Sequence, residues 1–535
     1  MDTSGVPSRQ SLDQSYSMKP VGSVEYRDAG SDGMGDESIV NRDEKEMAYL
    51  GKKQELKRRF GFMSMLGFTC TLLSTWEGIF VVFLYGYDNG GPAGLIYGYI
   101  YAWLGTFAIV ASIGELASMA PVAGGQYHWV AMLSPPEYYK FLSYLTGWVN
   151  VIGWQAVTAS VAFLGGTILQ GLLVLNYPNY VFERYHGTLL FYAVIALTLF
   201  VNTYLAKLLP KIEGIILIIH ICGFFGILIP LIYLSDHQSA SAVFGTFTNG
   251  GGWQTMGLSF FVGISTSVFS FLGADGACHM AEEIHNASTI VPWSMLATIG
   301  LNGVMGFAML IAVLFCINDA DAVLNSATGY PFIEIFRESA GSNAGATAMV
   351  AVVLALDIFA SFGYLASSSR MMWAFARDHG LPGSKYLARV EPKTALPLWS
   401  IALTVLISLL LALINVGSTE AFNAILSLVI SGFFCSYMLP ITLLIIKRVK
   451  NDPMRMGPFN MGRSFGLAVN IFAMIYGAIA VFFSFWPSTL VVDAASMNWS
   501  ILVFGVSVLF SVVYYFVYGH RFYTPPFVRR DHRDS

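Results

Sequence analysis

The chain has 535 residues, of which 55% are hydrophobic and 12% charged, with a formal net charge of −4 and a mean hydropathy of +0.60. A soluble protein of this length would not stay dispersed with so apolar a composition, which excludes the soluble classes. The composition therefore indicates an integral, multi-pass membrane protein that contacts the lipid bilayer and has no nucleic-acid partner.

The first segment, residues 1–59, is rich in Ser, Gly and Asp and lacks an apolar run. It predicts a disordered cytosolic tail that offers sites for regulatory partners. The tail closes with a basic cluster, which either orients the first span or anchors the tail at anionic lipid. The cluster consists of Lys52, Lys53, Lys57, Arg58 and Arg59.

Twelve apolar segments follow, and each is long enough to cross a ~30 Å hydrocarbon core with ~20 residues. They begin near Met65, Gly94, Phe141, Gly187, Ile212, Thr255, Ser294, Ala346, Trp399, Ala421, Phe465 and Trp499. The membrane domain thus covers residues 60–519, and residues 520–535 form a C-terminal tail.

The basic residues orient these spans. With the amino terminus inside, all of the 29 Lys and Arg residues except Arg184 and Arg337 fall on the cytoplasmic side or at cytoplasmic helix ends. The positive-inside rule therefore places both termini in the cytosol. The five cysteines lie in apolar segments without CxxC spacing, so we expect packing residues and no metal site.

Two spans contain residues that interrupt a helix. Ser74–Gly78 groups hydroxyls, an indole, a carboxylate and a glycine in the first span, and Phe271–Ile284 places two glycines and an aspartate in the sixth. Such breaks are tolerated at membrane depth only where free backbone groups line a cavity or contact a ligand, and they mark the binding sites of secondary transporters. The predicted substrate site comprises Ser74, Thr75, Trp76, Glu77, Gly78, Phe271, Gly273, Ala274, Asp275, Gly276 and, in the third span, Trp154.

The half-helix ends at these breaks offer amide hydrogens to an anion and carbonyls to a cation. Trp76, Phe271 and Trp154 could present an aromatic face to an ammonium group, although a Trp among apolar residues also serves ordinary packing. Glu77 would attract a cationic amine, or it could be buried and protonated and shape the break.

Several other ionisable residues lie inside spans, where a charge costs ~2.5–3.5 kcal/mol to insert. His220, Asp275, His279 and Asp357 are the titratable groups that could carry a coupling proton. Glu115 and Glu213 lie nearer the cytosolic ends, where they either snorkel to solvent or pair with bases.

The cytosolic connections after spans 2 and 8 contain tight-turn residues and charges. We expect a gate or scaffold there, in which Glu282 and Glu283 pair with bases such as Lys207 or Arg370. The predicted gate and scaffold residues are Glu115, Gly124, Gly125, Glu282, Glu283, Arg370, Arg377 and Asp378.

Three stretches resemble signature segments of the amino acid-polyamine-organocation superfamily, and they occur in the family order. They are Glu115–Tyr127, Gly273–Glu283 and Ser369–Pro382. Within the superfamily, Ser74–Gly78, Gly90–Pro92 and His279–Glu283 most resemble the fungal group that carries amino acids, γ-aminobutyrate and choline.

The resemblance implies an all-α fold with twelve transmembrane helices in a LeuT-like 5+5 inverted repeat, in which spans 1 and 6 are broken. Substrate would bind between spans 1, 3, 6, 8 and 10. Superfamily members generally bind a substrate carboxylate at the break of span 1, a role for which Trp76 and Glu77 are poorly suited. Glu77 favours a choline-like amine, with γ-aminobutyrate or a neutral amino acid as alternatives.

The coupling ion has two candidates. A sodium site would use oxygens near Ser74, Ser367 and Ser368, whereas a proton would use a titratable group. Resembling members often place a Lys in span 5 in lieu of sodium, and an approximate alignment puts His220 near that position, where it would be a pH-sensitive version of the same charge.

We expect a proton symporter of the plasma membrane that imports a small nitrogenous solute and needs no cofactor. An enzymatic activity is not expected, because the chain has no phosphate loop, metal-ligand cluster or nucleophile motif. The alternatives are an amino acid exchanger and a transporter-like nutrient sensor that signals through its tail. A channel is weaker still, since no filter motif is present.

Overall fold

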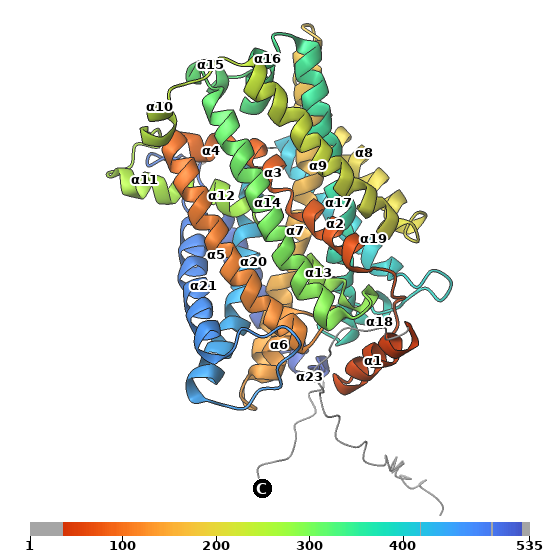
Figure 1. The fold of residues 1–535 in the computed structure, drawn as a ribbon. Coiled ribbons are helices and arrows are strands. Elements are labelled where there is room, and N and C mark those ends of the chain that lie inside the picture. The colour runs from red at the N-terminus through yellow and green to blue at the C-terminus, as the bar shows by residue number, and fades with distance from the viewer. Residues whose placement is uncertain (1–35, 418, 494–495, 527–535) are drawn as a thin grey trace, which may run out of the picture.

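The computed structural model describes residues 36–417, 419–493 and 496–526, which form helices and two isolated β-bridges but no strand. Ten of the described helices are long and apolar enough to cross a membrane, and they stand together as one bundle (Figure 1). They are α5 (Gly91–Met119), α7 (Tyr139–Asn176), α8 (Arg184–Thr203), α9 (Leu209–Leu234), α14 (Ala287–Phe315), α17 (Asn343–Arg377), α19 (Leu398–Gly417), α20 (Thr419–Lys450), α21 (Arg463–Ser484) and the continuous stretch Ser500–Phe522, which begins with α22 (Ser500–Tyr514).

The two remaining expected spans, the first and the sixth, are interrupted. The first consists of α2 (Phe62–Leu73), α3 (Thr75–Val81) and α4 (Phe83–Asp88). The sixth consists of α11 (Met256–Gly263), α12 (Ser265–Phe269), α13 (Gly276–His279) and the 3₁₀ turn η1 (Ala281–Glu283). The interruptions therefore lie in the two segments that the sequence singled out, while the count of twelve spans stays a prediction.

Short helices cover both ends of the bundle. One end, called here the α1 end, carries α1 (Asp36–Tyr49), α6 (Gln126–Leu133), α18 (Ser384–Leu387), the π-helix η2 (Tyr515–Gly519) and α23 (His520–Phe522) (Figure 1). The opposite end, called the α16 end, carries α10 (Ala240–Gly245), α15 (Ala320–Leu324) and α16 (Pro331–Ala340). The first and last described helices thus lie at the same end of the bundle.

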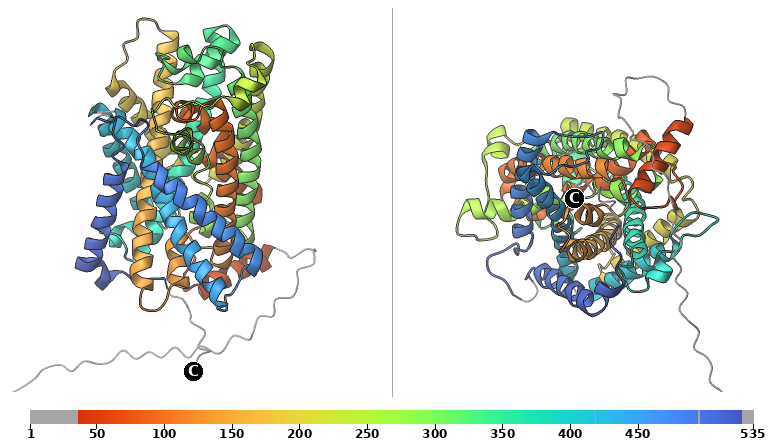
Figure 2. Two further views of the ribbon diagram at one scale, coloured as in Figure 1. Left: turned by 90° about the vertical axis from the view of Figure 1, so that its left-hand side faces the viewer. Right: turned by 90° about the horizontal axis from the view of Figure 1, so that it is seen from below.

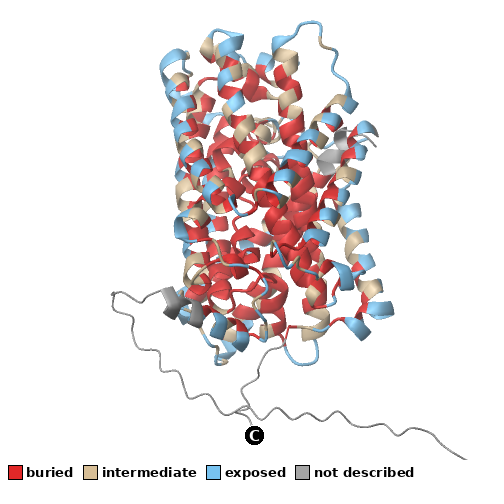
Figure 3. Cartoon of the chain, turned by 90° about the vertical axis from the view of Figure 1, so that its right-hand side faces the viewer, coloured by how far each residue is buried: buried red, intermediate tan, exposed pale blue. Residues whose placement is uncertain are grey.

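The centre of the bundle is closely packed and its outside is apolar. Seen from below, α7 lies inside a ring of other helices (Figure 2). Buried residues fill the interior and exposed ones lie on the periphery (Figure 3). The outer faces of α9 and α22 expose large apolar side chains, among them Ile218, Phe225, Ile229, Leu502 and Leu509. Such continuous apolar surfaces suit a hydrocarbon surrounding.

Local sequence signals explain several helix ends. The Ser342 hydroxyl accepts a hydrogen bond from the Gly345 amide (3.1 Å) and caps α17. Pro331 occupies the first turn of α16, and Gly341, with a φ of 62°, ends that helix in the left-handed conformation.

Residues 36–59, which we assigned to a disordered tail, instead hold α1 and an extended segment that packs against the α1 end. The Asp43 carboxylate accepts from the Asn286 amide (2.9 Å) and lies 3.5 Å from Arg58. The Gln54 amide donates to the Glu282 carbonyl (2.7 Å). Specific polar contacts with the bundle therefore order a segment whose composition predicts disorder, and residues 1–35 lie outside the described part of the chain.

The basic cluster of this segment binds protein groups more than solvent. Lys52 pairs with Asp378, Arg58 donates to the Ile284 carbonyl, and Arg59 donates to the Thr394 carbonyl (3.1 Å). Burial lowers the pKa of Lys52, although the nearby Asp378 carboxylate opposes that shift. Lys53 and Lys57 are exposed, so these two residues remain accessible to lipid headgroups.

Candidate substrate cavity and gate

The first helix break is centred on Ser74. Its φ of 39° and ψ of 47° are left-handed, a conformation that non-glycine residues rarely adopt. The Ser74 hydroxyl donates to the Thr71 carbonyl, and such a local hydrogen bond helps a serine to hold this turn. The chain can therefore change direction between α2 and α3 without a glycine at the break.

The second break covers residues 270–275, between α12 and α13. Gly273 has a φ of 109°, and a methyl group there would lie 2.7 Å from the Tyr364 hydroxyl oxygen. Both the backbone conformation and the available space therefore require glycine at this position.

Tyr364 of α17 joins the two breaks. Its hydroxyl donates to the Leu72 carbonyl (2.6 Å) at the end of α2 and lies 3.4 Å from the Leu272 carbonyl in the second break. Tyr364 is not among the predicted site residues, although a tyrosine within the apolar stretch of the eighth span was a visible signal. One side chain thus contacts carbonyls of both interrupted helices.

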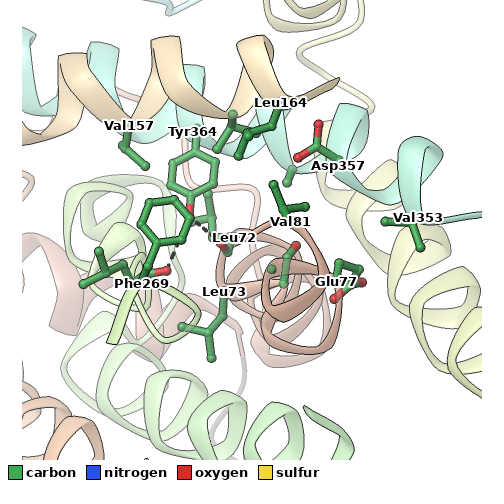
Figure 4. A pocket seen from close by; sticks show the side chains of 15 residues that line it. Leu72, Leu73, Glu77, Val81, Val157, Leu164, Phe269, Val353, Asp357 and Tyr364 are labelled. Carbon is green, nitrogen blue, oxygen red and sulfur yellow. Dashed lines mark hydrogen bonds between the residues drawn. The ribbon is translucent and has the colours of Figure 1, made fainter. Parts of the chain in front are cut away.

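A cavity of about 40 Å³ lies beside these breaks, a volume that holds no more than a few water molecules. Its walls come from α2, α3, α7, α17 and the end of α12 (Figure 4). The polar groups are Ser74, Glu77, Asp357 and Tyr364. The rest of the lining is apolar apart from Gly78, and consists of Leu72, Leu73, Val81, Val157, Val161, Leu164, Phe269, Leu272, Val353 and Ala360.

Helical spacing explains which residues of the first break face this cavity. Ser74, Glu77, Gly78 and Val81 recur at intervals of three and four and so share one face of α3. Thr75 and Trp76 point elsewhere, and Trp76 packs against Phe80, His220 and Phe224.

The other predicted substrate residues also lie outside the lining. Phe271 packs on Tyr99, and Trp154 packs on His279, Tyr364 and Phe433. Gly273, Ala274, Asp275 and Gly276 belong to the second break but do not border the cavity. None of the three aromatic rings suggested to face an ammonium group, those of Trp76, Trp154 and Phe271, therefore borders this cavity, because each ring packs against other side chains.

Glu77 is paired rather than free. Its Oε1 lies 2.7 Å from Nδ1 of His220 on α9, and both side chains are buried. Its other oxygen, Oε2, has no hydrogen-bond partner among the described residues. The carboxyl group thus contacts a titratable base with one oxygen while it borders the cavity.

Asp357 is the second carboxyl group of the cavity. It is buried, and its Oδ2 has no partner among the described residues. Gly165 of α7 leaves room for it, since a methyl group at Gly165 would lie 2.8 Å from this oxygen. The cavity therefore combines two carboxyl groups, each with an unpartnered oxygen, with largely apolar walls.

Asp275 and His279 form a second polar cluster, between α13 and α6. Nδ1 of His279 lies 2.9 Å from the Ala123 carbonyl and must donate to it, which leaves Nε2 without a proton in the neutral ring. That nitrogen faces Oδ2 of Asp275 at 3.6 Å. In the neutral ring this nitrogen is an acceptor, so it makes no hydrogen bond with the carboxylate oxygen.

Amide side chains connect this cluster to the surrounding helices. The Gln126 amide donates to the same Asp275 oxygen (2.8 Å) and accepts from the Asn150 amide (2.9 Å). Oδ1 of Asp275 has no partner among the described residues. The cluster therefore lies next to the turn of Gly124 and Gly125, which leads into α6.

Buried ion pairs hold the α1 end together. Arg377 binds Glu282 with both terminal nitrogens (2.7 and 3.0 Å), and Arg370 binds Glu283 (2.8 Å). Asp378 accepts from the Tyr127 hydroxyl (2.8 Å) in addition to Lys52. The expected pairing of Glu283 with Arg370 is present, whereas Glu282 pairs with Arg377 instead of Lys207.

Glu115 takes part in another buried pair. Both of its oxygens accept from Arg448 of α20 (2.7 Å each), and one also accepts from the Met461 amide (2.8 Å). Of the two alternatives for Glu115, snorkelling to solvent or pairing with a base, the structure has the pairing. The pair connects α5 to α20 and to the segment before α21.

Comparison with known proteins gives the family of this chain. Residues 60–508 match the family described as amino acid permease. A Macrophomina phaseolina protein, provisionally named as an amino acid/polyamine transporter, is 34% identical over 82% of this chain and 96% of its own length. The choline transporter of Saccharomyces cerevisiae is 32% identical over 86% of this chain and 81% of its own, and the amino-acid permease BAT1 of Arabidopsis thaliana is 28% identical over 92% and 98%. The chain belongs to the amino acid permease family of the amino acid-polyamine-organocation superfamily.

Proposed function

We propose that this permease imports a small organic amine by alternating access, as a secondary active transporter driven by protons. The observation that carries the proposal is the cavity between the interrupted helices, which presents Glu77 and Asp357 in otherwise largely apolar walls. A cavity with this lining favours a ligand that combines a positive charge with apolar groups.

A choline-like amine fits this description best. An ammonium ~4 Å from a carboxylate gains roughly 4 kcal/mol at an intermediate dielectric, while its methyl groups suit the aliphatic walls. The similarity to the Saccharomyces cerevisiae choline transporter supports the same class. γ-Aminobutyrate and neutral amino acids remain the alternatives, and their carboxylates would have to bind at free amides of the breaks, away from Glu77.

The small cavity volume and the two breaks support alternating access. In this proposal, a form whose cavity holds only a few waters is the closed form of the transporter. The turn at Ser74 is the point about which α2 moves while α3 stays in place. In this proposal the chain has twelve spans in a LeuT-like 5+5 arrangement, with both termini in the cytosol of a cell whose plasma membrane it occupies. The α1 end is then the cytosolic end.

The proposed coupling ion is a proton. Asp275 with His279, and Glu77 with His220, are buried pairs in which protonation changes the charge. Sodium is the alternative, with ligands near Ser74, Ser367 and Ser368. The Ser367 hydroxyl donates to the Gly276 carbonyl (3.4 Å) and the Ser368 hydroxyl accepts from Gln155 (2.9 Å), so each oxygen keeps a lone pair for a cation.

Uptake of radiolabelled choline, γ-aminobutyrate and a neutral amino acid into permease-deficient yeast tests the proposal. The expected result is accumulation of choline that is stronger at acidic external pH, is abolished by a protonophore and persists without sodium. Accumulation only in cells preloaded with an amino acid would indicate an exchanger. Absence of uptake for all three solutes, with the protein at the cell surface, would overturn the proposal.

A further inference from the structure

Glu213 of α9 has an environment that neither snorkelling nor charge pairing explains. Its side chain is 0% exposed, so the carboxyl group does not reach solvent. Neither of its oxygens has a hydrogen-bond partner among the described residues, and it forms no ion pair within that part of the chain. A buried carboxyl group in such surroundings is stable only in its protonated form.

Glu213 lies where α9 touches α2. A methyl group at Gly67 of α2 would lie 2.5 Å from the Glu213 carbonyl oxygen, so the two backbones are in close contact. Thr71, one turn further along α2, is the side chain that interacts with the carboxyl group, although no hydrogen bond of normal geometry joins the two. Its hydroxyl donates to the Gly67 carbonyl (2.8 Å) and so cannot stabilise a carboxylate with the same proton.

The same face of α9 also contacts the other half of the broken helix. His220 lies seven residues after Glu213, two helical turns or about 10 Å away, and it pairs with Glu77 of α3. Because α2 and α3 are separated by the turn at Ser74, a movement of α2 would change the surroundings of Glu213 and leave the Glu77–His220 contact in place.

The charged neighbours of α9 do not face Glu213. The ionisable groups on the helices packed against α9 are Cys70 of α2, Asp357, Tyr364, Arg370 and Arg377 of α17, and Glu334, Arg337 and Glu338 of α16, while α14 has none. None of these groups interacts electrostatically with Glu213, and neither do the exposed Lys207 and Lys211 at the start of α9. Glu213 therefore titrates without a charged partner.

We propose that Glu213 is a proton-binding residue that controls the contact between α2 and α9. The protonated carboxyl group allows the two helices to pack. When α2 moves away, water reaches the group, the carboxylic acid releases its proton to that water, and the carboxylate that remains opposes reclosure. The inference rests on the proposed function, because it assigns the release of a proton to the opening of the α1 end.

Hydrogen–deuterium exchange of α2 peptides tests this inference without any substrate. The purified full-length protein is measured in lipid nanodiscs between pH 6 and pH 8, and the rates are corrected for intrinsic exchange with an unstructured reference peptide. For a single linked proton, the population of the form with α2 open should increase by at most about tenfold per pH unit, once the pH exceeds the pKa of the carboxyl group in its hydrated, open form. Peptides of α3 should show no such dependence.

Variants identify the group responsible. Glu213→Gln, which resembles the protonated form, should remove the pH dependence of α2, and Glu213→Met replaces it if the glutamine variant does not fold. Asp236→Asn, at an exposed carboxylate just beyond the other end of α9, should leave the dependence unchanged. A flat profile in the wild-type protein, or an unchanged slope in Glu213→Gln, would overturn the inference. If the exchange result holds but choline is not taken up, the transport proposal fails and the control of α2 by Glu213 stands.

Discussion

Replacement of Tyr364 by phenylalanine should separate the two helix breaks. The substitution removes the hydroxyl that donates to the Leu72 carbonyl (2.6 Å) and approaches the Leu272 carbonyl (3.4 Å), and it leaves the ring in place. A buried carbonyl without a partner costs about 1–3 kcal/mol. If water reaches these carbonyls in the open form, the substitution destabilises only the closed form. The ratio of closed to open molecules should then fall by roughly 5- to 150-fold.

Tyr99→Phe is the matched control. The Tyr99 hydroxyl is also buried and donates to a backbone carbonyl, that of Gly303 (2.9 Å), but at the contact between α5 and α14. Both variants should lower the temperature of thermal unfolding by similar amounts. Only Tyr364→Phe should change transport.

The assay is the concentration dependence of choline uptake, measured together with surface expression. We expect Tyr364→Phe to raise the KM for choline, because the form open at the α1 end becomes more populated and does not bind choline from outside the cell, which reduces the apparent affinity in proportion. The reasoning would be refuted if Tyr364→Phe and Tyr99→Phe gave the same KM and the same maximal rate.

Three further predictions test the charges. Glu77→Gln should raise the KM for choline far more than that for a neutral amino acid, and equal effects in the uptake assay would show that Glu77 does not select a cation. Arg377→Met should cost about 3–5 kcal/mol of stability, since it leaves the buried Glu282 charge unpaired, and Glu282→Gln should cost less, since the partly exposed Arg377 keeps Asp378 nearby. The double variant should cost less than the sum of the two in chemical denaturation; additive losses would mean that the two groups are not coupled. Lys52→Gln should loosen the segment of residues 42–60 and increase its proteolysis at the α1 end, while Lys53→Gln, at an exposed neighbour, should behave like the wild type.

The helix breaks could be predicted from the sequence because residues of these types are unfavourable in an uninterrupted transmembrane helix. Gly273 and Gly276 weaken a helix, and Asp275 is costly in hydrocarbon, so their presence in an apolar stretch predicted an interruption. In the structure, the first helix is interrupted by a left-handed turn at Ser74 and the second by the longer segment of residues 270–275, as the composition of the two segments indicated.

The lining of the cavity could not be predicted to the same degree, because it depends on how each helix is rotated about its axis. Neighbouring residues such as Trp76 and Glu77 differ by about 100° in direction along a helix, and only one of them faces the cavity. Tyr364 and Val157 come from helices whose register against α2 is set by packing, which composition does not specify. The ordered structure of residues 36–59 could not be predicted for a related reason, because it depends on contacts with residues that are distant in sequence, such as Asp378 and Asn286.

The two ends of the bundle are closed by different forces, and this difference bears on the order of opening. At the α1 end the contacts are ion pairs such as that of the buried Glu282 with Arg377. Near the α16 end, the ring of Phe80 in α3 packs on the rings of Phe332 and Phe336 in α16, with ring centroids 5.5 and 5.3 Å apart. Separation of aromatic rings exposes apolar surface at about 25 cal/mol per Å², a cost that water does not return. Separation of ion pairs costs their attraction, but water then hydrates both charges and offsets most of that loss. Under the proposed alternating access, water and protons that reach the α1 end would therefore favour its opening, while the hydrophobic effect would keep the α16 end closed until a ligand in the cavity moved α3.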